Sequence, residues 1–396
     1  MNRYLRAVFL LLAGLSGQRV SAAAPPARHD WLGYTELRTD LPGGRHANIR
    51  TMRATVVRAD GTARRTLAEG LARQPDSWTQ FAGWSPDGKV AILGRGWQSP
   101  ENARWEEEHK QFRFTKEGYL LDSYLLDMAT GEATNLTAID RVSYYNSGLF
   151  FWPNDPKRLG FTALICGSSQ PFRMGRDGRN KESPTKGSKE FAYGFSGSRD
   201  GKRVAYHKDY QVYLADADGS NAARVKTGKP FDFVPSWSPD GKWVLFLSGE
   251  HYDCHPHLVR ADGTGLKKLA DRGGYKGVID FLDVPDFHGG SSDVPVWSAD
   301  GRSVFYTALV GGSVELFRVT LDGKTIRLTE TPAGTLHYHP QPSPDGKRLA
   351  YGSKRGGVRQ LFVMSLAGGT ERQITRLAPG HAAMWPHWRP VPVAPR

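Results

Sequence analysis

The chain has 396 residues and a formal net charge of +13, and 39% of its residues are hydrophobic. It contains no glycine-rich phosphate loop, no Gly-x-Ser-x-Gly elbow and no Cys-x-x-Cys pair, so nucleotide use, serine-dependent hydrolysis and thiol redox chemistry have no support. The excess of cationic residues favours polyanionic partners.

The N-terminal segment has the pattern of a secretory signal. Arg3 and Arg6 precede an apolar run at 7–15, and small residues before position 25 provide a cleavage site. This run is shorter than a membrane span, so no membrane span is predicted. We therefore expect residues 1–24 to be a signal peptide and the mature chain to be periplasmic or secreted. Outside the cytoplasm, its polyanionic partner would be an acidic oligosaccharide and not a nucleic acid.

A turn sequence, Ser-Pro-Asp-Gly-Lys after an aromatic residue, recurs along the chain. It follows Trp84 and Trp237, and a variant follows Trp297. Each copy lies between two β-rich segments and predicts a strand, a tight turn and a second strand. An Asp-Gly or Gly-Gly turn then joins a third strand to a fourth, which often ends in Leu-Thr. A repeat of about 40–45 residues with four strands is typical of a β-propeller blade.

Six complete repeats and part of a seventh are predicted. The seventh has an innermost strand at 385–388, while the N-terminal segments 34–39, 52–61 and 63–68 have strand patterns without a repeat of their own. These N-terminal strands are expected to complete the last blade and close the ring. The prediction is an all-β, seven-bladed β-propeller forming a single domain over residues 25–396, with six blades as the alternative. The six complete repeats begin at Trp84, Trp152, Phe195, Trp237, Trp297 and Pro342.

Eleven of the twelve histidines are predicted to lie on one face of this ring. In a four-stranded blade the first-to-second and third-to-fourth turns share one face. The second-to-third loops and the connections between blades share the other, and the histidines fall in these segments. Insertions at 94–120, 166–190 and 271–293 are assigned to the same face. Because functional residues concentrate on loops held by a rigid scaffold, we expect the functional site on this "histidine face".

Three histidines form a candidate metal site. His337 and His339 are two residues apart in an extended segment, so their imidazoles are expected to point the same way. His251 is expected to meet them at the mouth of the central channel. Neutral imidazoles with one open position suit Zn²⁺, Mn²⁺ or a similar ion. Rival third ligands are His255, His257 and His288.

Two tryptophans lie outside the blade pattern. Trp97 and Trp105 belong to the first insertion and are candidates for stacking against sugar rings. The tryptophans that recur at one position of each blade are instead expected to pack between blades.

The turn sequence, the Leu-x-x-x-Asp-x-x-Gly pattern that follows it and the Leu-Thr strand together resemble the TolB-like (PD40, WD40-like) propeller repeat. The resemblance covers nearly the whole mature chain. It implies the fold and says little of activity, because TolB-like propellers include both binding proteins and enzymes.

The chain is also similar to the oligogalacturonate lyase family, which consists of seven-bladed propellers with a Mn²⁺ site on one face. His337-Tyr338-His339-Pro340 runs into the Ser-Pro-Asp-Gly turn at 343–346, as does the family's His-x-His-Pro segment that supplies two metal ligands. His251 matches a further ligand, which follows a second strand two blades earlier. The resemblance implies a divalent metal cofactor, Mn²⁺ first, with Zn²⁺ or Ca²⁺ as alternatives.

Two further positions bear on this resemblance. His207 corresponds to the catalytic histidine of the family, one blade before His251. Gly334 stands where the family has a glutamine ligand, so His288 or water would have to complete the metal site.

Two functions follow as hypotheses. The first is an exported, metal-dependent lyase that cleaves uronate-containing oligosaccharides by β-elimination. The metal would neutralise the substrate carboxylate, and His207 would remove the adjacent proton as general base. Arg176 or Arg179, in the second insertion, would bind further carboxylates. The second hypothesis is a non-catalytic periplasmic TolB-like propeller that acts as a binding or scaffold protein. Either protein is expected to be a monomer.

Overall fold

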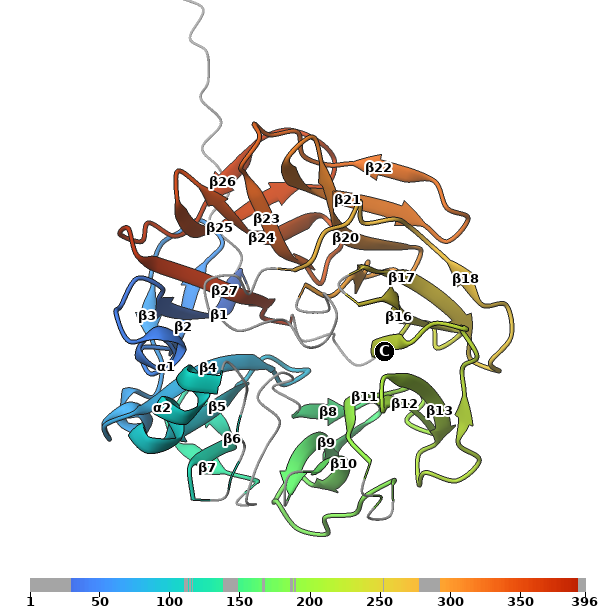
Figure 1. Cartoon of the computed structure of the whole chain (residues 1–396), viewed down its shortest axis with the longest axis horizontal. Helices are drawn as coiled ribbons and strands as arrows, with labels where there is room; N and C mark the ends of the chain where they lie inside the picture. Colours follow the sequence, from blue (N-terminus) through green and yellow to red (C-terminus); the bar gives the residue numbers. More distant parts are fainter. Residues whose placement is uncertain are drawn as a thin grey trace, which may run out of the picture.

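The described part of the chain consists almost entirely of short antiparallel strands (Figure 1). Its helices are α1 (Gly44–Ile49), α2 (Pro100–His109) and the 3-10 helix η1 (Glu69–Ala72). Within the described ranges, no helix has the length and apolar character needed to cross a bilayer. The computed structural model describes residues 30–109, 113, 115, 117–137, 149–165, 168–185, 188, 190–251, 253–277 and 293–390.

The strands of the described residues form five hydrogen-bonded sheets, arranged around a common centre in Figure 1. The largest sheet, with twelve strands, consists of three successive antiparallel sets that are joined to one another by single parallel bridges. We call each antiparallel set a blade and number the blades in chain order for reference. Blade 1 contains β4 (Ser77–Trp84), β5 (Val90–Gln98), β6 (Tyr119–Asp127) and β7 (Ala133–Asn135). Blade 2 contains β8 (Phe150–Trp152), β9 (Asp155–Ile165) and β10 (Ser168–Gly175). Blade 3 contains β11 (Ala192–Gly197), β12 (Arg203–Lys208), β13 (Gln211–Asp216) and β14 (Ala223–Arg224).

The remaining sets follow the same order, from the innermost strand to the outermost. Blade 4 contains β15 (Phe231–Trp237), β16 (Trp243–Glu250), β17 (Asp253–Arg260) and β18 (Lys267–Lys268). Blade 5 contains β19 (Val296–Trp297), β20 (Ser303–Val310), β21 (Ser313–Thr320) and β22 (Thr325–Arg327). Blade 6 contains β23 (Leu336–Pro342), β24 (Arg348–Arg355), β25 (Val358–Ser365) and β26 (Glu371–Gln373). Blade 7 contains β27 (His381–Trp388), β1 (Trp31–Arg38), β2 (Arg53–Arg58) and β3 (Arg65–Thr66).

Blade 7 joins the two ends of the chain, as predicted. Strand β1 pairs antiparallel with β27, with Leu32 opposite Trp388 and Arg38 opposite His381. The N-terminal strands therefore cover the edge that β27 would otherwise leave open. A hydrogen bond of 3.1 Å from the Trp84 indole to the carbonyl of His387 then links blade 7 to blade 1.

The recurring turn sequence is explained by its hydrogen bonds. In blade 1, the Ser85 hydroxyl donates to Asp87 Oδ1 at 2.6 Å and accepts the Val90 N–H at 2.9 Å. Gly88 has φ 65°, a left-handed conformation that costs glycine little. Serine, aspartate and glycine at these spacings therefore build the turn that connects the first two strands of a blade.

The Leu-Thr ending of the fourth strand also has a structural reason. In blade 6, where the ending is Ile374-Thr375, the Thr375 hydroxyl accepts the Leu361 N–H at 2.9 Å and donates to Gln360 Oε1 at 2.7 Å. Thr137 and Thr329 accept an N–H from the third strand of blades 1 and 5 in the same way. The threonine thus ties the outer edge of the blade to its third strand.

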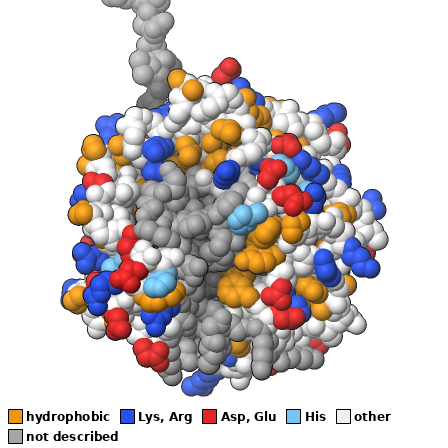
Figure 2. Space-filling view, in the orientation of Figure 1, with side chains coloured by type: hydrophobic (Ala, Val, Ile, Leu, Met, Phe, Trp, Pro, Cys, Tyr) orange, Lys and Arg blue, Asp and Glu red, His pale blue; other side chains and the backbone are white. Residues whose placement is uncertain are grey.

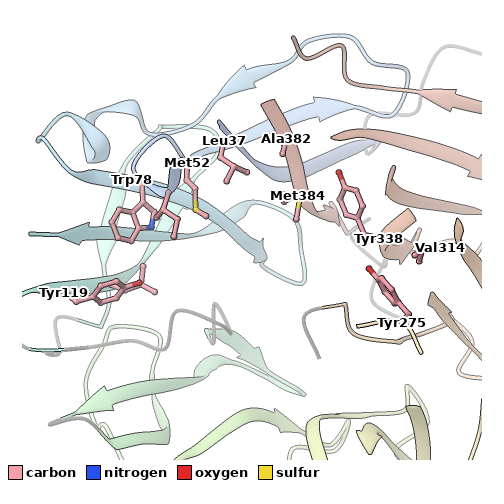
Figure 3. Close-up of a cluster of buried hydrophobic side chains, with 11 residues drawn as sticks. Leu37, Met52, Trp78, Tyr119, Tyr275, Val314, Tyr338, Ala382 and Met384 are labelled. Atoms are coloured by element: carbon pink, nitrogen blue, oxygen red, sulfur yellow. The ribbon is translucent and has the colours of Figure 1, made fainter. Parts of the chain in front are cut away.

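Buried side chains fill the space between neighbouring blades. The recurring tryptophans take part as predicted: Trp237 packs between blades 3 and 4, and Trp388 between blades 6 and 7. Another cluster includes Met52 and Trp78 from blades 7 and 1, with Tyr338 and Met384 from the innermost strands of blades 6 and 7 (Figure 3).

Candidate functional site

The histidine face carries both α-helices. Helix α1 joins the second and third strands of blade 7, and α2 joins those of blade 1. Figure 2 shows histidine and hydrophobic side chains around the central part of the molecule. His207 and His251 lie at the ends of second strands, and so on the same side as the two helices.

His207 is built into the boundary between blades 3 and 4. It lies on β12, is 2% exposed, and packs edge-on against Tyr193 and Phe233. Its Nδ1 accepts the backbone N–H of Val234 on β15 at 3.3 Å. In a neutral ring this bond assigns the proton to Nε2, so His207 is arranged as a hydrogen-bond acceptor for the next blade. Its role as general base stays a prediction.

His339 makes the equivalent bond at the boundary between blades 6 and 7. Its Nδ1 accepts the backbone N–H of Trp385 at 3.3 Å, and its ring stacks on that indole with centroids 5.6 Å apart. The backbone N–H of His339 itself donates to Asp293 Oδ1 at 2.8 Å. His339 therefore links blades 6 and 7 through its side chain.

The sequence pattern predicted that the imidazoles of His337 and His339 point the same way, but in the structure they point in different directions. A β-bulge interrupts β23 between Tyr338 and Gln341, and His339 has φ 48°. A left-handed residue breaks the strict alternation of side chains along a strand. As a result His339 faces Trp385, whereas His337 packs edge-on against Tyr351 within blade 6.

His337 is fully buried beside a carboxylate. Its Nε2 lies 3.6 Å from Glu315 Oε2, and neither ring nitrogen has a hydrogen-bond partner within the described residues. Glu315 is held ionised by hydrogen bonds from Ser313 and Thr331, and its pKa is lowered to about 2 although burial opposes this. Burial, with a contribution from the Arg355 cation, lowers the pKa of His337 to about 4. The ring is therefore neutral at physiological pH.

This burial predicts an acid-dependent loss of stability. Because the folded-state pKa of about 4 lies below the ordinary 6.5, the unfolded chain binds the proton more readily between these values. The stabilisation is complete above pH 6.5 and decreases as pH falls toward 4, by about 2.5 kcal/mol at about pH 4.5. His337→Phe keeps His387, whose pKa burial also lowers to about 4, so both proteins lose stability in acid, but urea unfolding at neutral and acidic pH should show a larger loss in the wild type by about 2.5 kcal/mol. Equal losses in both proteins would contradict the assignment.

The three predicted metal ligands are not brought together. His251 is exposed at the end of blade 4, and its ring packs at a 42° tilt against Phe231, with centroids 5.2 Å apart. Across the described ranges, no three His, Cys, Asp or Glu side chains are grouped so that they could hold a metal ion. His251, His337 and His339 as placed therefore do not fit Mn²⁺. His288 lies outside the described residues.

The two rival ligands have local partners. His255 Nδ1 accepts the backbone N–H of Arg272 at 3.2 Å, and its Nε2 lies 3.4 Å from Asp253. His257 Nδ1 donates to the carbonyl of His255 at 2.9 Å, and burial lowers the pKa of both histidines. Both rings are thus placed by contacts within blade 4 and its connection to blade 5.

The predicted position of Arg176 and Arg179 is wrong. Strand β9 continues to Ile165 and β10 begins at Ser168, so the segment is no long second-to-third loop. The two arginines follow β10, in a third-to-fourth turn, on the face opposite the histidines. The Arg176 guanidinium lies over the Phe151 ring at 5.3 Å. They cannot share a pocket with His207 in this arrangement, and a role in carboxylate binding would belong to the other face.

The two candidate tryptophans are partly buried on the histidine face. Trp97 belongs to β5, where it pairs with Ser77 and Leu120, and so lies in a blade and not in an insertion. Trp105 lies on α2 and stacks on His109, with centroids 4.1 Å apart and an 11° angle between planes. Stacking of either tryptophan against a sugar stays a prediction.

A buried polar network between α1 and α2 was not predicted. Arg45 on α1 forms an ion pair with Glu106 on α2, and the two side chains are 3% and 2% exposed. Glu106 also accepts the Gln98 amide at 2.7 Å, and Gln98 contacts His46 Nδ1 at 3.1 Å. His46 Nε2 continues the network to Asp76 at 3.2 Å. No sequence pattern links two helices so far apart in the chain.

An aromatic strip on the same face was also missed. Tyr210, in the turn between β12 and β13, contacts Phe231 edge-on with centroids 5.3 Å apart. Phe231 in turn contacts His251 at 5.2 Å. Lys229, just before Phe231, and Glu250, just before His251, form an ion pair with a separation of 3.1 Å. The sequence signal would have been an aromatic residue where other blades have glycine.

Comparison with known proteins identifies the fold. No family model matches the chain. It is 24% identical over 274 residues to an uncharacterized protein of Agrobacterium fabrum, which covers 64% of this chain and 86% of that protein. It is 27% identical over 162 residues to the TolB homolog of Chlorobium luteolum, covering 41% of this chain and 33% of that protein. This second match therefore spans a third of the TolB homolog.

Solved structures of TolB-like propellers are also similar to this chain. TolB from Acinetobacter baumannii has a TM-score of 0.50 and 17% identity, covering 91% of this chain and 67% of that one. An oligogalacturonate lyase in complex with manganese has a TM-score of 0.55 and 16% identity, covering 82% and 81%. The chain is a TolB-like β-propeller, as its repeats predicted. Lyases and peptidases share this fold, so the fold alone does not assign an activity.

Proposed function

We propose that this chain is an exported, non-catalytic TolB-like propeller that binds acidic oligosaccharides. The observation that carries the proposal is the structural role of the His207 and His339 imidazoles. His207 and His339 each accept a backbone N–H from the next blade, so they hold the ring together. A lyase would need one as a free base and the other as a metal ligand.

The ligand class rests on charge and location. Removal of Arg3, Arg6 and Arg19 with the predicted signal peptide lowers the formal net charge from +13 to +10, and this positive charge attracts polyanions, which outside the cytoplasm include uronate polysaccharides. The histidine face supplies aromatic side chains beside the centre of the ring. An acidic oligosaccharide combines charge with ring faces that aromatic side chains can contact.

A direct binding measurement tests this proposal. The mature chain, purified without a histidine tag, is titrated calorimetrically with hexamers of galacturonate, alginate and a glycosaminoglycan. We expect binding to at least one hexamer, weakening as salt is raised because exposed charges are screened. Absence of binding to all three would overturn the proposal.

The lyase remains the second candidate, favoured by the His-x-His-Pro segment and by the fold shared with a manganese-bound oligogalacturonate lyase. The same hexamers, incubated with the protein and added Mn²⁺, separate the two functions. Beta-elimination would create an unsaturated uronate that absorbs in the ultraviolet. We expect no such product, and a steady increase in absorbance would contradict the non-catalytic proposal.

A further inference from the structure

The turn that carries Tyr210 has an unusual backbone for its residues. Asp209 and Tyr210 lie between the paired residues Lys208 and Gln211, and have φ values of 45° and 58°. Both residues of this two-residue hairpin turn are therefore left-handed, a conformation that suits glycine and strains a residue with a side chain. A tyrosine here works against the local preference of the turn.

Other blades of the same chain show the unstrained solution. The equivalent turn of blade 5 is Gly311-Gly312, with φ values of 59° and 83°. The equivalent turn of blade 6 is Gly356-Gly357, with φ values of 60° and 84°. Blade 3 thus keeps the backbone of these turns while placing a large aromatic side chain on it. Strain of this kind points to a role outside folding.

The strained turn fixes the tyrosine at the surface. The Tyr210 carbonyl accepts the backbone N–H of Asp232 at 2.9 Å and the Gln211 side-chain amide at 2.6 Å. The ring stands edge-on against Phe231 and Phe233, and the residue is 37% exposed. The backbone and the ring are both held in place before any ligand arrives.

We propose that Tyr210, Phe231 and His251 form a saccharide-binding strip, on which sugar rings stack. This inference rests on the proposed function and assigns its binding site. The three rings are continuous, with successive centroids 5.3 and 5.2 Å apart. A pyranose presents an apolar C–H face to such rings and hydroxyl groups at its edge. The Lys229–Glu250 ion pair and the Gln211 amide provide polar groups from the same segments.

Size favours a saccharide over a protein partner. A stable protein interface buries about 800 Å² on each partner. The strip consists of three side chains, and Tyr210 exposes little more than a third of its surface. An area of this kind covers a few sugar rings. Because Lys229 is already paired with Glu250, the strip recognises ring faces, and the carboxylates of an acidic ligand are attracted by the overall charge.

The test compares two substitutions in one turn. Tyr210→Gly removes the tyrosine ring and relieves the backbone strain at position 210. Asp209→Gly relieves the same kind of strain at position 209 and keeps the tyrosine ring. Affinities are measured with hexagalacturonate and with cellohexaose, an uncharged hexamer. We expect Tyr210→Gly to weaken binding of both hexamers by about tenfold and Asp209→Gly to leave it unchanged. The melting temperature of Tyr210→Gly should stay within about 2 °C of the wild type, because relief of strain offsets the lost ring contacts.

Each of the other outcomes would contradict the proposal that the strip binds saccharides. Unchanged affinity in Tyr210→Gly would place the saccharide elsewhere and leave the proposed function intact. Equal loss in both variants would show that the turn conformation matters and the ring does not. Loss of binding together with a larger fall in melting temperature would make Tyr210 a packing residue. If the wild type bound neither hexamer, the strip would not be a saccharide site, and the proposed function would fail too only if the alginate and glycosaminoglycan hexamers also did not bind.

Discussion

Replacing Tyr338 with alanine is expected to lower the free energy of unfolding by about 3–5 kcal/mol. The side chain is fully buried on β23, and its hydroxyl donates to the carbonyl of Ala383 on β27 at 2.9 Å. Its ring lies directly over Gly352, where an added Cβ would overlap the ring. Removing the ring leaves a cavity between the innermost strands of blades 6 and 7 (Figure 3). Urea unfolding followed by tryptophan fluorescence measures the change.

Tyr338→Phe is the matched control for this result. It keeps the ring and removes only the hydrogen bond to Ala383, so a loss of about 1 kcal/mol is expected. An alanine variant no less stable than the phenylalanine variant would show that the ring does not fill this space in solution.

Replacing Glu106 with glutamine is expected to destabilise the chain by about 3–5 kcal/mol, because it leaves the Arg45 guanidinium buried without its counter-charge. Both side chains are almost completely buried between α1 and α2. Glu106 also accepts the Gln98 amide and the backbone N–H of Arg113, so the substitution disturbs several contacts of one carboxylate. Thermal unfolding and urea unfolding both report this effect.

Two further variants serve as controls for Glu106→Gln. Glu108→Gln makes the same chemical change at an exposed position of α2 and should change stability by less than about 0.5 kcal/mol. Arg45→Met combined with Glu106→Leu removes both charges and should recover most of the lost stability, since no unpaired charge remains. A double variant as unstable as Glu106→Gln would contradict a role for the buried charge.

The repeats were sufficient to predict the fold because their residues determine the conformation of the turns in which they lie. Ser85, Asp87 and Gly88 form a turn through their own hydrogen bonds and backbone freedom, so the turn can be recognised without knowing its surroundings. The closure by N-terminal strands followed from counting strands that lacked partners. Both inferences depend on interactions within a few residues or on strand pairing.

The candidate site was harder to predict, because its side chains respond to neighbouring blades. The left-handed backbone of His339 turns its ring toward Trp385, and no residue spacing reveals such a bulge. Arg176 was assigned to the wrong face because residues 166–190 were taken as an insertion, whereas this segment contains β10, the third strand of its blade. The contact between α1 and α2 depends on two insertions from different blades, which the repeat itself does not specify.

The pairing of β1 with β27 also affects how the chain reaches its folded state. Synthesis proceeds from the N-terminus, so β1 to β3 emerge long before β27, the innermost strand of their blade. The ring can close only after β27 has been made. Until then β1 presents an unpaired hydrogen-bonding edge, the kind of edge through which incomplete chains associate with one another. Strand β1 thus depends on a strand made much later, β27, for protection against aggregation.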